Sequence, residues 1–493
     1  MKHNNEKLPA EELHNQITFY LNGQQIQEVL APGISTLDWL HKQKHLHGTK
    51  CSCNEGDCGA CTVVIAFRHN ETIAYEAINS CLYPAAKLHG KHIITIEALG
   101  DTKNLHPIQQ SLLEHHGTQC GYCTPGFVMS MFALFATFTH PNKETILSAL
   151  EGNLCRCTGY QSILDAAQEI AENFIPDQLV PQWCREIEKQ LLEFEESAAM
   201  VVKPKNAVGL VNRYLTPENL KVLFDYFAME PDALFIAGGT DLMVQMNINR
   251  KEYPVLIDLT GIPELNKLYQ QADCLHIGAS VTYNQLYTCD FVSQGYPELH
   301  KLISQIASQQ IRNFGTLCGN IANASPIGDS LPLLMVLDAN LRLQSELEIR
   351  HVPIRDFFVA YRQTALHKGE IIREVILAPT PQNAYVKCIK SAKRKSVDIS
   401  AVITAMRLEQ DSGTITNAIF ALGGVASTPI ISKTFTSLME NKKLTSIDVN
   451  QVCHAVADEF APLSDVRGSS EYRHTLIRNH LDLYLKEFLE VPR

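Results

Sequence analysis

The chain lacks the sequence features of a secreted, membrane-spanning or nucleic-acid-binding protein. Its first sixteen residues are polar and contain no apolar segment of the kind that a signal peptide requires. The longest apolar run, 127–138, is too short to span a bilayer. With a net charge of −11, the chain also lacks the basic excess that nucleic-acid binding needs. We therefore expect a soluble, cytoplasmic protein that binds neither membrane nor nucleic acid.

The chain also lacks the even, dispersed cysteine pattern of a disulfide framework. It has fifteen cysteines, and eight of them crowd into the regions 51–61 and 120–157. A chain of 493 residues is long enough for roughly three or four domains with cores of normal size, so it does not need disulfides as staples. This distribution favours metal ligation in a reducing compartment. No nucleophile–base pair is evident, so substrate chemistry is expected elsewhere.

The cysteine loop 51–61, CSCNEGDCGAC, is the strongest chemical signal in the sequence. Cys53, Cys58 and Cys61 follow the C-x4-C-x2-C spacing, and Cys81 follows after nineteen residues, as in plant-type [2Fe–2S] sites. Glycines in this loop permit the tight turns that aim N–H groups at sulfide. A zinc site would more often show two C-x2-C pairs, and a run of buried free thiols is the plainer alternative. If Cys51 replaced Cys53, the first spacing would be C-x6-C and not C-x4-C, so we expect Cys51 not to be a ligand.

The segments around this loop predict a small sheet. Alternation over 16–30 around Asn22-Gly23 predicts a hairpin, and 31–43 predicts a short helix capped by Ser35 or Thr36. The stretch 61–81 predicts a second hairpin that carries Cys81, and 92–99 predicts a closing strand. This arrangement resembles a plant-type ferredoxin domain.

From residue 104 onward the pattern becomes helical. Apolar residues recur at three- and four-residue spacing over 106–117, 124–138, 143–153 and 160–174. Two cysteine pairs lie between these helices: Cys120 with Cys123, and Cys155 with Cys157. A thioredoxin-like C-x2-C would need a βαβ context, which is absent here. Four thiolates from two interhelical loops predict a second metal site, either an iron–sulfur cluster or zinc.

Two glycine-rich stretches mark the second half of the chain. A predicted helix and strand lead into the turn 237–241, AGGTD, which lacks the G-x-G-x-x-G spacing of a dinucleotide-binding Rossmann turn. Such a turn can still cradle a pyrophosphate with bare N–H groups. The second stretch, 310–320, is followed by IANASPIGDSLP. Together the two stretches supply N–H and hydroxyl hydrogen-bond donors and few bulky side chains, which suits the binding of a large anionic cofactor.

Three segments together carry a family resemblance: TKCSCNEGDCGACTV, TQCGYCTPGFVMS and EGNLCRCTGYQSI. In this order and spacing they resemble the two [2Fe–2S] domains of the molybdenum hydroxylases, the xanthine dehydrogenase and aldehyde oxidase family. The resemblance implies that one cluster is held by Cys53, Cys58, Cys61 and Cys81. It implies that the other, which in the family lies nearest the molybdenum cofactor, is held by Cys120, Cys123, Cys155 and Cys157.

The two glycine-rich stretches resemble the FAD domain of the same family. The FAD contacts that the resemblance implies are Phe235, Ile236, Ala237, Gly238, Gly239, Thr240, Asp241, Leu242, Thr316, Leu317, Cys318, Gly319, Asn320, Asp329, Ile372 and Lys390. Cys318 stands where the family usually has glycine, and we expect it to be a small residue in a tight place. Tyr361 either borders the nicotinamide pocket or packs in the core. Lys395-Ser396-Val397 replace an acidic run of animal members before Asp398-Ile399, which leaves O₂ or another carrier as a competitor to NAD⁺.

The implied fold class is multidomain α+β. It comprises a β-grasp plant-type ferredoxin domain over 14–100, a four-helix [2Fe–2S] bundle domain over 101–176, a solvated linker with a helical stretch in it over 177–203, an α+β FAD-binding domain of the vanillyl-alcohol-oxidase/PCMH type over 204–383, and a C-terminal α+β domain like that of CO dehydrogenase flavoproteins over 384–493. The last domain ends in a predicted amphipathic helix, 469–489.

The resemblance implies a redox function: electrons pass through two [2Fe–2S] clusters to FAD and on to NAD⁺. Because no molybdenum-cofactor segment follows, we expect the small subunit of a split family member that oxidises hypoxanthine or xanthine on a separate molybdopterin-binding large subunit. Relatives such as carbon monoxide dehydrogenase usually place the iron–sulfur and flavin parts on separate chains. The alternatives are a member that oxidises an aldehyde or N-heterocycle, a stand-alone NAD(P)H-dependent reductase, and a zinc-bound interaction module.

Overall fold

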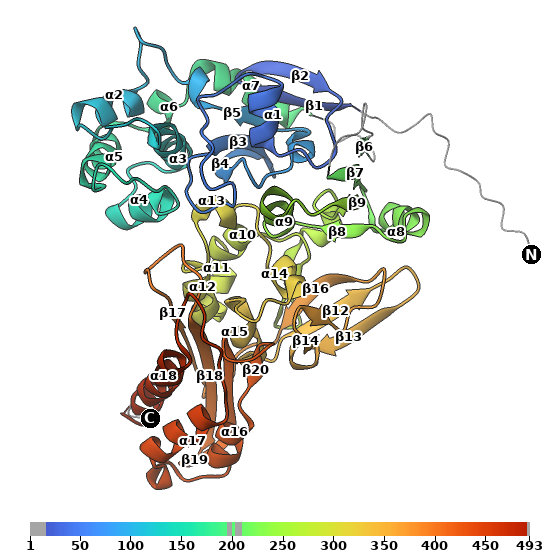
Figure 1. Cartoon of the computed structure of the whole chain (residues 1–493), viewed down its shortest axis with the longest axis vertical. Coiled ribbons are helices and arrows are strands. Elements are labelled where there is room, and N and C mark those ends of the chain that lie inside the picture. The colour runs from blue at the N-terminus through green and yellow to red at the C-terminus, as the bar shows by residue number, and fades with distance from the viewer. Residues whose placement is uncertain (1–15, 195–199, 203–209, 491–493) are drawn as a thin grey trace, which may run out of the picture. The chain divides into compact units, whose positions relative to one another are not determined.

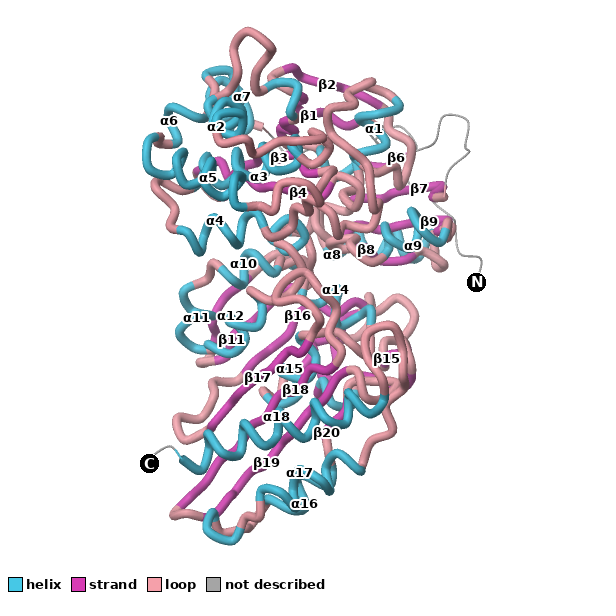
Figure 2. The backbone as a smooth tube through the Cα atoms, turned by 60° about the vertical axis from the view of Figure 1, so that its left-hand side comes forward, coloured by secondary structure: helices cyan, strands magenta, loops and turns pink. Residues whose placement is uncertain are grey.

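The structure, a computed structural model, describes residues 16–194, 200–202 and 210–490 (Figures 1 and 2). Its chain divides into two compact units. The first contains the residues up to Pro263 together with Ser308–Phe314, and the second contains Glu264–Ala307 and the residues from Gly315 onward. The FAD-binding domain expected over 204–383 is therefore shared between the units. Its expected start near Pro204 lies outside the described residues.

The first unit begins with a mixed five-stranded sheet in the order β2-β1-β5-β3-β4. Its strands are β1 (Ile17–Leu21), β2 (Gln24–Glu28), β3 (Thr62–His69), β4 (Thr72–Asn79) and β5 (His92–Ile94). Asn22 and Gly23 both have positive φ, which confirms the hairpin predicted from this dipeptide. Helix α1 (Thr36–Lys42) lies over the sheet (Figure 1), and the Ser35 side chain caps it.

Both faces of this sheet are buried, which explains why its central strands are apolar throughout. One face packs on α1, where Phe19 and Trp39 meet edge to face. The other face, with Val64 and Ala77, packs against the helices that follow. The predicted closing strand 92–99 is wrong beyond Ile94. There the Asn22 side chain pairs with Thr95, which ends the strand, and a 3-10 turn, η2 (Ile96–Ala98), follows.

The four predicted helices of the next region are confirmed. They are α2 (Pro107–Glu114), α3 (Thr124–Thr137), α4 (Lys143–Leu150) and α5 (Gln161–Asn173). Helix α3 is apolar all round and is buried from Gly126 to Phe135, packing on β3 and β4.

The helical stretch predicted within the linker 177–203 is present, but it is packed against the first sheet and not solvated. Helices α6 (Pro176–Leu179) and α7 (Gln182–Leu192) occupy it, and α7 packs on β3 and β4. Cys184, Ile187 and Leu191 repeat at helical spacing and are buried in the core formed with α3. The charged residues on the opposite face of α7 gave the segment the composition of a linker. Residues 195–199 lie outside the described part of the chain.

The first unit closes with a second sheet, in the order β6-β7-β9-β8. Strands β7, β8 and β9 run parallel. The elements are β6 (Met200–Val202), β7 (Val211–Thr216), α8 (Leu220–Met229), β8 (Leu234–Ile236), α9 (Leu242–Asn249) and β9 (Tyr253–Asp258). Short helix α13 (Gln309–Arg312) also belongs to this unit.

The second unit contains two antiparallel sheets. The first, in the order β10-β11-β16-β12-β13, comprises β10 (Leu268–Gln271), β11 (Cys274–Gly278), β12 (Asn340–Gln344), β13 (Ile349–Pro353) and β16 (Ile371–Leu377). The short helices of this unit are α10 (Tyr283–Tyr287), α11 (Asp290–Gly295), α12 (Pro297–Ile303), α14 (Leu317–Asn323) and α15 (Ser330–Val336). A small hairpin, β14 (Phe358–Ala360) and β15 (Gln363–Thr364), precedes β16.

The other sheet forms the C-terminal α+β domain. Its strands are β17 (Tyr385–Ser391), β18 (Val402–Asp411), β19 (Thr414–Gly423) and β20 (Ile430–Ile431), and its helices are α16 (Lys433–Met439), α17 (Val449–Asp458) and α18 (Ser470–Glu490). Figure 2 shows α18 along the long strands. Buried residues of α18, such as Leu481 and Tyr484, pack in one core with Phe420, which confirms the predicted terminal helix.

A pair of neighbouring leucines tests the packing of α7. Leu191 is 1% exposed and Leu192 is 37% exposed. Leu191→Ala should lower the free energy of unfolding by about 2–5 kcal/mol, because it leaves a cavity in the core. Leu192→Ala should change it by less than about 0.5 kcal/mol. Hydrogen exchange of the β3 and β4 amides in the full chain measures both, and equal effects would contradict the packed helix.

Candidate iron–sulfur and flavin sites

The first cysteine set lies between α1 and β3, with Cys81 just after β4. The thiols hydrogen-bond in pairs, Cys53 with Cys58 and Cys61 with Cys81. The N–H groups of Asp57 and Glu55 approach the Cys53 sulfur at 3.3 and 3.5 Å. The hydrogen bond from Cys58 is the main cause that lowers the pKa of Cys53 to about 5, and these N–H groups add to it. The same hydrogen bond raises the pKa of Cys58, its partner in the pair.

The second set lies in the two loops that flank α3 and α4. Cys120 and Cys123 precede α3, and Cys155 and Cys157 lie between α4 and α5. The sulfurs of Cys157 and Cys120 are 3.7 Å apart, and Cys123 hydrogen-bonds to Cys155. The Thr158 hydroxyl donates to the Cys155 sulfur over 3.2 Å. All four predicted cysteines thus face one another in two pairs.

The paired geometry bears on the choice between iron–sulfur and zinc. Over the described ranges 16–194, 200–202 and 210–490, no three Cys, His, Asp or Glu side chains converge on one metal-ion position. Four thiolates in two pairs match the two irons of a [2Fe–2S] cluster, which share four thiolates. The donor set, two pairs of thiols with N–H groups aimed at sulfur, fits a [2Fe–2S] cluster in each loop system.

Cys51 is set apart from its neighbours. It is exposed, and its carbonyl accepts a hydrogen bond from the Tyr122 hydroxyl in the second cysteine loop. That Cys51 is not a ligand stays a prediction. All fifteen cysteines fall in the described part of the chain, and all are free thiols.

The backbones of the two cysteine loops touch. The Leu154 N–H donates to the Cys58 carbonyl over 3.0 Å, and the Asn153 side-chain amide donates to the Gly59 carbonyl over 3.0 Å. A Cβ on Gly59 would lie 2.3 Å from the Gly152 carbonyl oxygen, and one on Gly126 would lie 2.4 Å from the Gly59 oxygen. The approach therefore requires glycine at these positions. It connects a predicted ligand of one set, Cys58, with the residue before a ligand of the other, Cys155.

Helix α13 completes this junction, and the sequence did not reveal it. The buried Gln310 side chain donates to Ser130, Asn153 and the Ala149 carbonyl over 2.9–3.1 Å. Arg312, also buried, pairs with Glu151 at 3.2 Å. The polar run Gln-Gln-Ile-Arg-Asn at 309–313 was the available signal, but only tertiary structure places it against the cysteine loops.

The first glycine stretch, 235–242, lies wholly in the first unit. Ile236 ends β8, Gly239 has φ +84°, and α9 begins at Leu242. Positive φ at Gly239 is a conformation that favours glycine. Within the described residues, the N–H groups of Gly238, Gly239 and Thr240 have no backbone acceptor. A strand that ends in bare amides at the start of a helix fits an anionic phosphate group.

The second stretch, 316–320, lies in the second unit. Thr316 caps α14, and its hydroxyl accepts from the Gly319 N–H over 3.0 Å. Asn320 accepts from the Ser330 hydroxyl over 2.8 Å. Leu317 and Cys318 are buried, and Cys318 has ordinary helical backbone inside α14. A residue with a side chain is therefore accommodated there, as expected of a small residue in a tight place.

Asp329 and Lys390 meet in the second unit, although 61 residues separate them. Their charged groups are 2.7 Å apart, and the Ser400 hydroxyl donates to the other Asp329 oxygen over 2.5 Å. The Lys390 amine also donates to the Gln305 carbonyl over 2.9 Å. Two residues that the family resemblance implies as separate flavin contacts thus form one polar cluster, and the sequence did not predict their contact.

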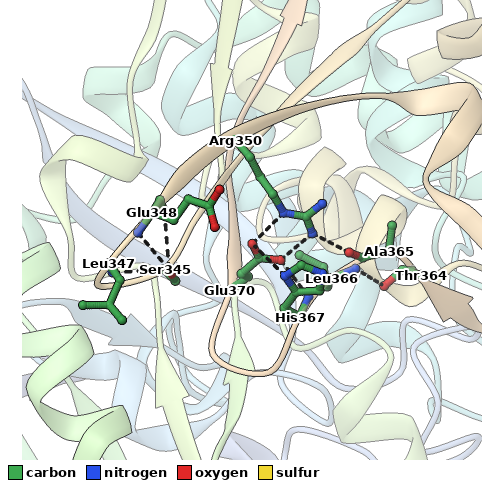
Figure 3. A network of polar contacts seen from close by, with 9 residues as sticks. All are labelled: Ser345, Leu347, Glu348, Arg350, Thr364, Ala365, Leu366, His367 and Glu370. Atoms are coloured by element: carbon green, nitrogen blue, oxygen red, sulfur yellow. Dashed lines mark hydrogen bonds and ion pairs between the residues drawn. The ribbon is translucent and has the colours of Figure 1, made fainter.

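Ile372, another predicted contact, is buried in β16, two residues after Glu370. Glu370 belongs to a network of polar contacts (Figure 3). Glu370 receives two hydrogen bonds of 2.7 Å from the Arg350 guanidinium, and Arg350 also binds the Ala365 carbonyl. The Arg350 hydrogen bonds hold the pKa of Glu370 below its usual range. The loop before β16 is thereby fixed. Tyr361, in the turn between β14 and β15, is 59% exposed, which excludes the core-packing alternative.

Comparison with known sequence families accounts for most of the chain. Four family profiles match in succession: "2Fe-2S iron-sulfur cluster binding domain" at residues 19–86, "[2Fe-2S] binding domain" at 95–168, "FAD binding domain in molybdopterin dehydrogenase" at 207–381, and "CO dehydrogenase flavoprotein C-terminal domain" at 387–488. The chain belongs to the molybdenum hydroxylase family. It contains two [2Fe–2S]-binding domains and an FAD-binding domain, and the predicted multidomain α+β fold class is confirmed.

Curated relatives agree with this assignment. Xanthine dehydrogenase 1 of Arabidopsis thaliana is 31% identical over 96% of this chain and 39% of its own length. Xanthine dehydrogenase of Emericella nidulans is 30% identical over 88% of this chain and 36% of its own length. Aldehyde oxidase 2 of Rattus norvegicus is 30% identical over 97% and 39%. The chain spans about two fifths of the length of these relatives.

Two solved structures match this chain over almost their whole length, and they cover a little more than half of it. A chain of the Cu,Mo-CO dehydrogenase matches with a TM-score of 0.53 and 26% identity over 57% of this chain and 98% of its own. A chain of quinoline 2-oxidoreductase from Pseudomonas putida 86 matches with a TM-score of 0.52 and 26% identity over 58% and 99%. Of the helices that the structure describes, none combines the length and apolarity needed to cross a bilayer.

The ligand sets can be tested one thiol at a time. Cys58→Ser should remove the electron paramagnetic resonance signal of one reduced cluster and leave the other, because each set of four thiols is separate. Cys51→Ser is the matched control in the same loop and should leave both signals intact. Loss of a cluster signal in Cys51→Ser would assign this thiol to the ligand set instead.

The polar cluster at Asp329 can be tested for FAD retention. Asp329→Asn removes the charge that pairs with Lys390 and should release FAD, while the absorbance of both clusters persists. Asp338→Asn, at the opposite end of α15, is the control, because Asp338 also pairs with arginine side chains. Flavin content per iron–sulfur absorbance is the readout. Equal flavin content in both variants would remove Asp329 from the flavin site.

Proposed function

We propose that this chain is the electron-transfer subunit of a xanthine dehydrogenase. In this proposal hypoxanthine or xanthine is oxidised on a molybdopterin-binding partner subunit. The present chain conducts the electrons from there through two [2Fe–2S] clusters to FAD and NAD⁺. Iron–sulfur clusters carry single electrons and flavins exchange one or two, which is the chemistry the cofactors supply when bound. All other contributions come from the residues that hold and orient them.

The single observation that carries the proposal is the contact between the cysteine loops. Cys53, Cys58, Cys61 and Cys81 would hold one cluster, and Cys120, Cys123, Cys155 and Cys157 the other. The Leu154 N–H donates a hydrogen bond to the carbonyl of Cys58, a proposed ligand of the first set. Leu154 directly precedes Cys155, a proposed ligand of the second set, so one hydrogen bond and one peptide unit connect the two sets. A protein that bound the two metal centres for unrelated structural reasons would not need such an approach.

The flavin ligands in this proposal are those that the family resemblance implies. The amides of 235–242 would bind the pyrophosphate, and 316–320, Asp329, Ile372 and Lys390 would supply the remaining contacts. Tyr361, exposed beside the fixed loop before β16, is the candidate residue at the nicotinamide side. NAD⁺ is the proposed acceptor. A reducing, cytoplasmic location belongs to the same proposal, because all fifteen cysteines are free.

A second candidate function is oxidation of an aldehyde or an N-heterocycle by the same kind of complex. The similarity to aldehyde oxidase 2 and to quinoline 2-oxidoreductase favours it. The proposed role of this chain is the same in both cases, since electrons would enter it through the same clusters.

Purification from the native source distinguishes these proposals. We expect a larger, molybdenum-containing chain to co-elute, and xanthine to bleach the flavin and cluster absorbance of the complex under anaerobic conditions. Bleaching by an aldehyde or quinoline but not by xanthine would favour the second candidate. If no molybdenum co-elutes and NADH alone reduces both clusters for an unrelated acceptor, the chain is a stand-alone reductase and the proposal fails.

The acceptor is tested on the same complex. After reduction by substrate, NAD⁺ should reoxidise the flavin faster than dissolved O₂ does at equal concentration. Stopped-flow absorbance measures both rates. Faster reoxidation by O₂ would identify an oxidase.

A further inference from the structure

A lysine of the first iron–sulfur domain reaches the predicted flavin turn, and both belong to the first unit. Lys87 lies in the 3-10 turn η1 (Ala85–Leu88), six residues after Cys81. Its side chain is 5% exposed. Its amine donates a hydrogen bond to the carbonyl of Ala237, the first residue after β8, and lies 3.5 Å from an oxygen of Asp258.

Asp258 does not depend on Lys87 for its hydrogen bonds. Its side chain, 2% exposed, accepts from the Tyr214 hydroxyl over 2.6 Å and from the Thr260 N–H and hydroxyl over 2.9 and 2.7 Å. Burial lowers the pKa of the Lys87 amine. Protonated or neutral, the amine keeps an N–H for the Ala237 carbonyl. Asp258 thus keeps its hydrogen bonds without Lys87, whereas the hydrogen bond to the Ala237 carbonyl in the flavin turn comes from Lys87.

The sheet leaves the Ala237 carbonyl without a strand partner. Ile236 is the last residue of β8 in register with β9, and its carbonyl accepts from Leu259 N–H over 2.8 Å. The next carbonyl, that of Ala237, is where Lys87 binds. In a trans peptide the C=O and the following N–H point in opposite directions, and the described backbone has no cis peptide. Holding the Ala237 carbonyl toward Lys87 thus points the Gly238 N–H away from it.

A second contact ties the same turn to the first cysteine loop. Asn247, on the helix α9 that begins just after the turn, donates to the Cys81 carbonyl over 2.9 Å and to the Asn54 carbonyl over 3.1 Å. Asn54 follows the predicted ligand Cys53. The first iron–sulfur domain thus holds the turn in two ways: Lys87 binds its Ala237 carbonyl, and Asn247 ties the following helix α9 to the cysteine loop.

We propose that Lys87 is a positioning residue for FAD: by holding the Ala237 carbonyl, it presents the amides of Gly238 to Thr240 to the pyrophosphate. This inference rests on the proposed role of the turn in FAD binding and extends it. It makes FAD affinity depend on a side chain of the first iron–sulfur domain, with Asn247 holding the helix behind the turn.

The test is FAD titration of the deflavo full chain, followed by flavin fluorescence. Lys87→Met keeps the length and packing of the side chain but removes the donor, and should weaken FAD binding roughly tenfold or more. ADP, which carries the pyrophosphate without the flavin ring, should lose affinity as a competitor by the same factor. Lys91→Met, four residues along the same segment, is the matched control and should bind both within twofold of the unchanged chain.

Lys87→Met leaves the buried Asp258 carboxylate without the lysine cation beside it. The double variant Lys87→Met/Asp258→Asn removes that unpaired charge as well. It should regain thermal stability but keep the weakened binding of FAD and ADP, with both cluster signals unchanged. FAD binding equal to that of the unchanged chain in this double variant would overturn the proposal. Loss of the cluster signals together with FAD would also overturn it, since Lys87 would then be purely structural. Failure of the unchanged chain to bind FAD would instead contradict the proposed function itself.

Discussion

The structure of the first unit depends on the close approach of two loop backbones that carry cysteine ligands. Gly59, Gly126 and Gly152 meet there without Cβ atoms, and Asn153 fills the junction with its amide. Any larger residue at Gly59 or Gly126 would push a carbonyl oxygen out of contact. The approach brings the Cys58 carbonyl to the Leu154 N–H, so that a through-backbone connection joins the two thiol sets.

The surrounding fold keeps this junction rigid. The apolar helix α3 buries itself against the ferredoxin sheet, and α7 covers β3 and β4 beside it. Gln310 enters from a segment that belongs to the chain's flavin-binding half and donates to Ser130 and Asn153, which also hydrogen-bond to each other. Lys87 and Asn247 connect the other side of the iron–sulfur domain to the turn after β8. Within this unit, the first iron–sulfur domain is thus hydrogen-bonded both to the second cysteine loop and to the turn after β8.

Local sequence signals predicted most of the fold. Asn22-Gly23 predicted its hairpin, Ser35 its helix cap, and the helical periodicity of 104–175 all four helices, because each depends on residues near in sequence. A helical stretch was expected in the segment of α7, but its packing was not, since its charged face dominates its composition. The cysteine spacing predicted which thiols group together. Asn153, Gln310 and Lys87 could not be predicted, because a buried polar side chain is defined by partners that are distant in the sequence.

The central claim is that the chain carries two electron-carrying clusters joined to a flavin. An anaerobic reductive titration of the purified chain, followed by electron paramagnetic resonance and visible absorbance, tests it most directly. The account predicts two distinct [2Fe–2S] signals of equal intensity and a flavin that is reduced in the same titration. A single cluster signal, or a colourless protein that contains zinc, would contradict it.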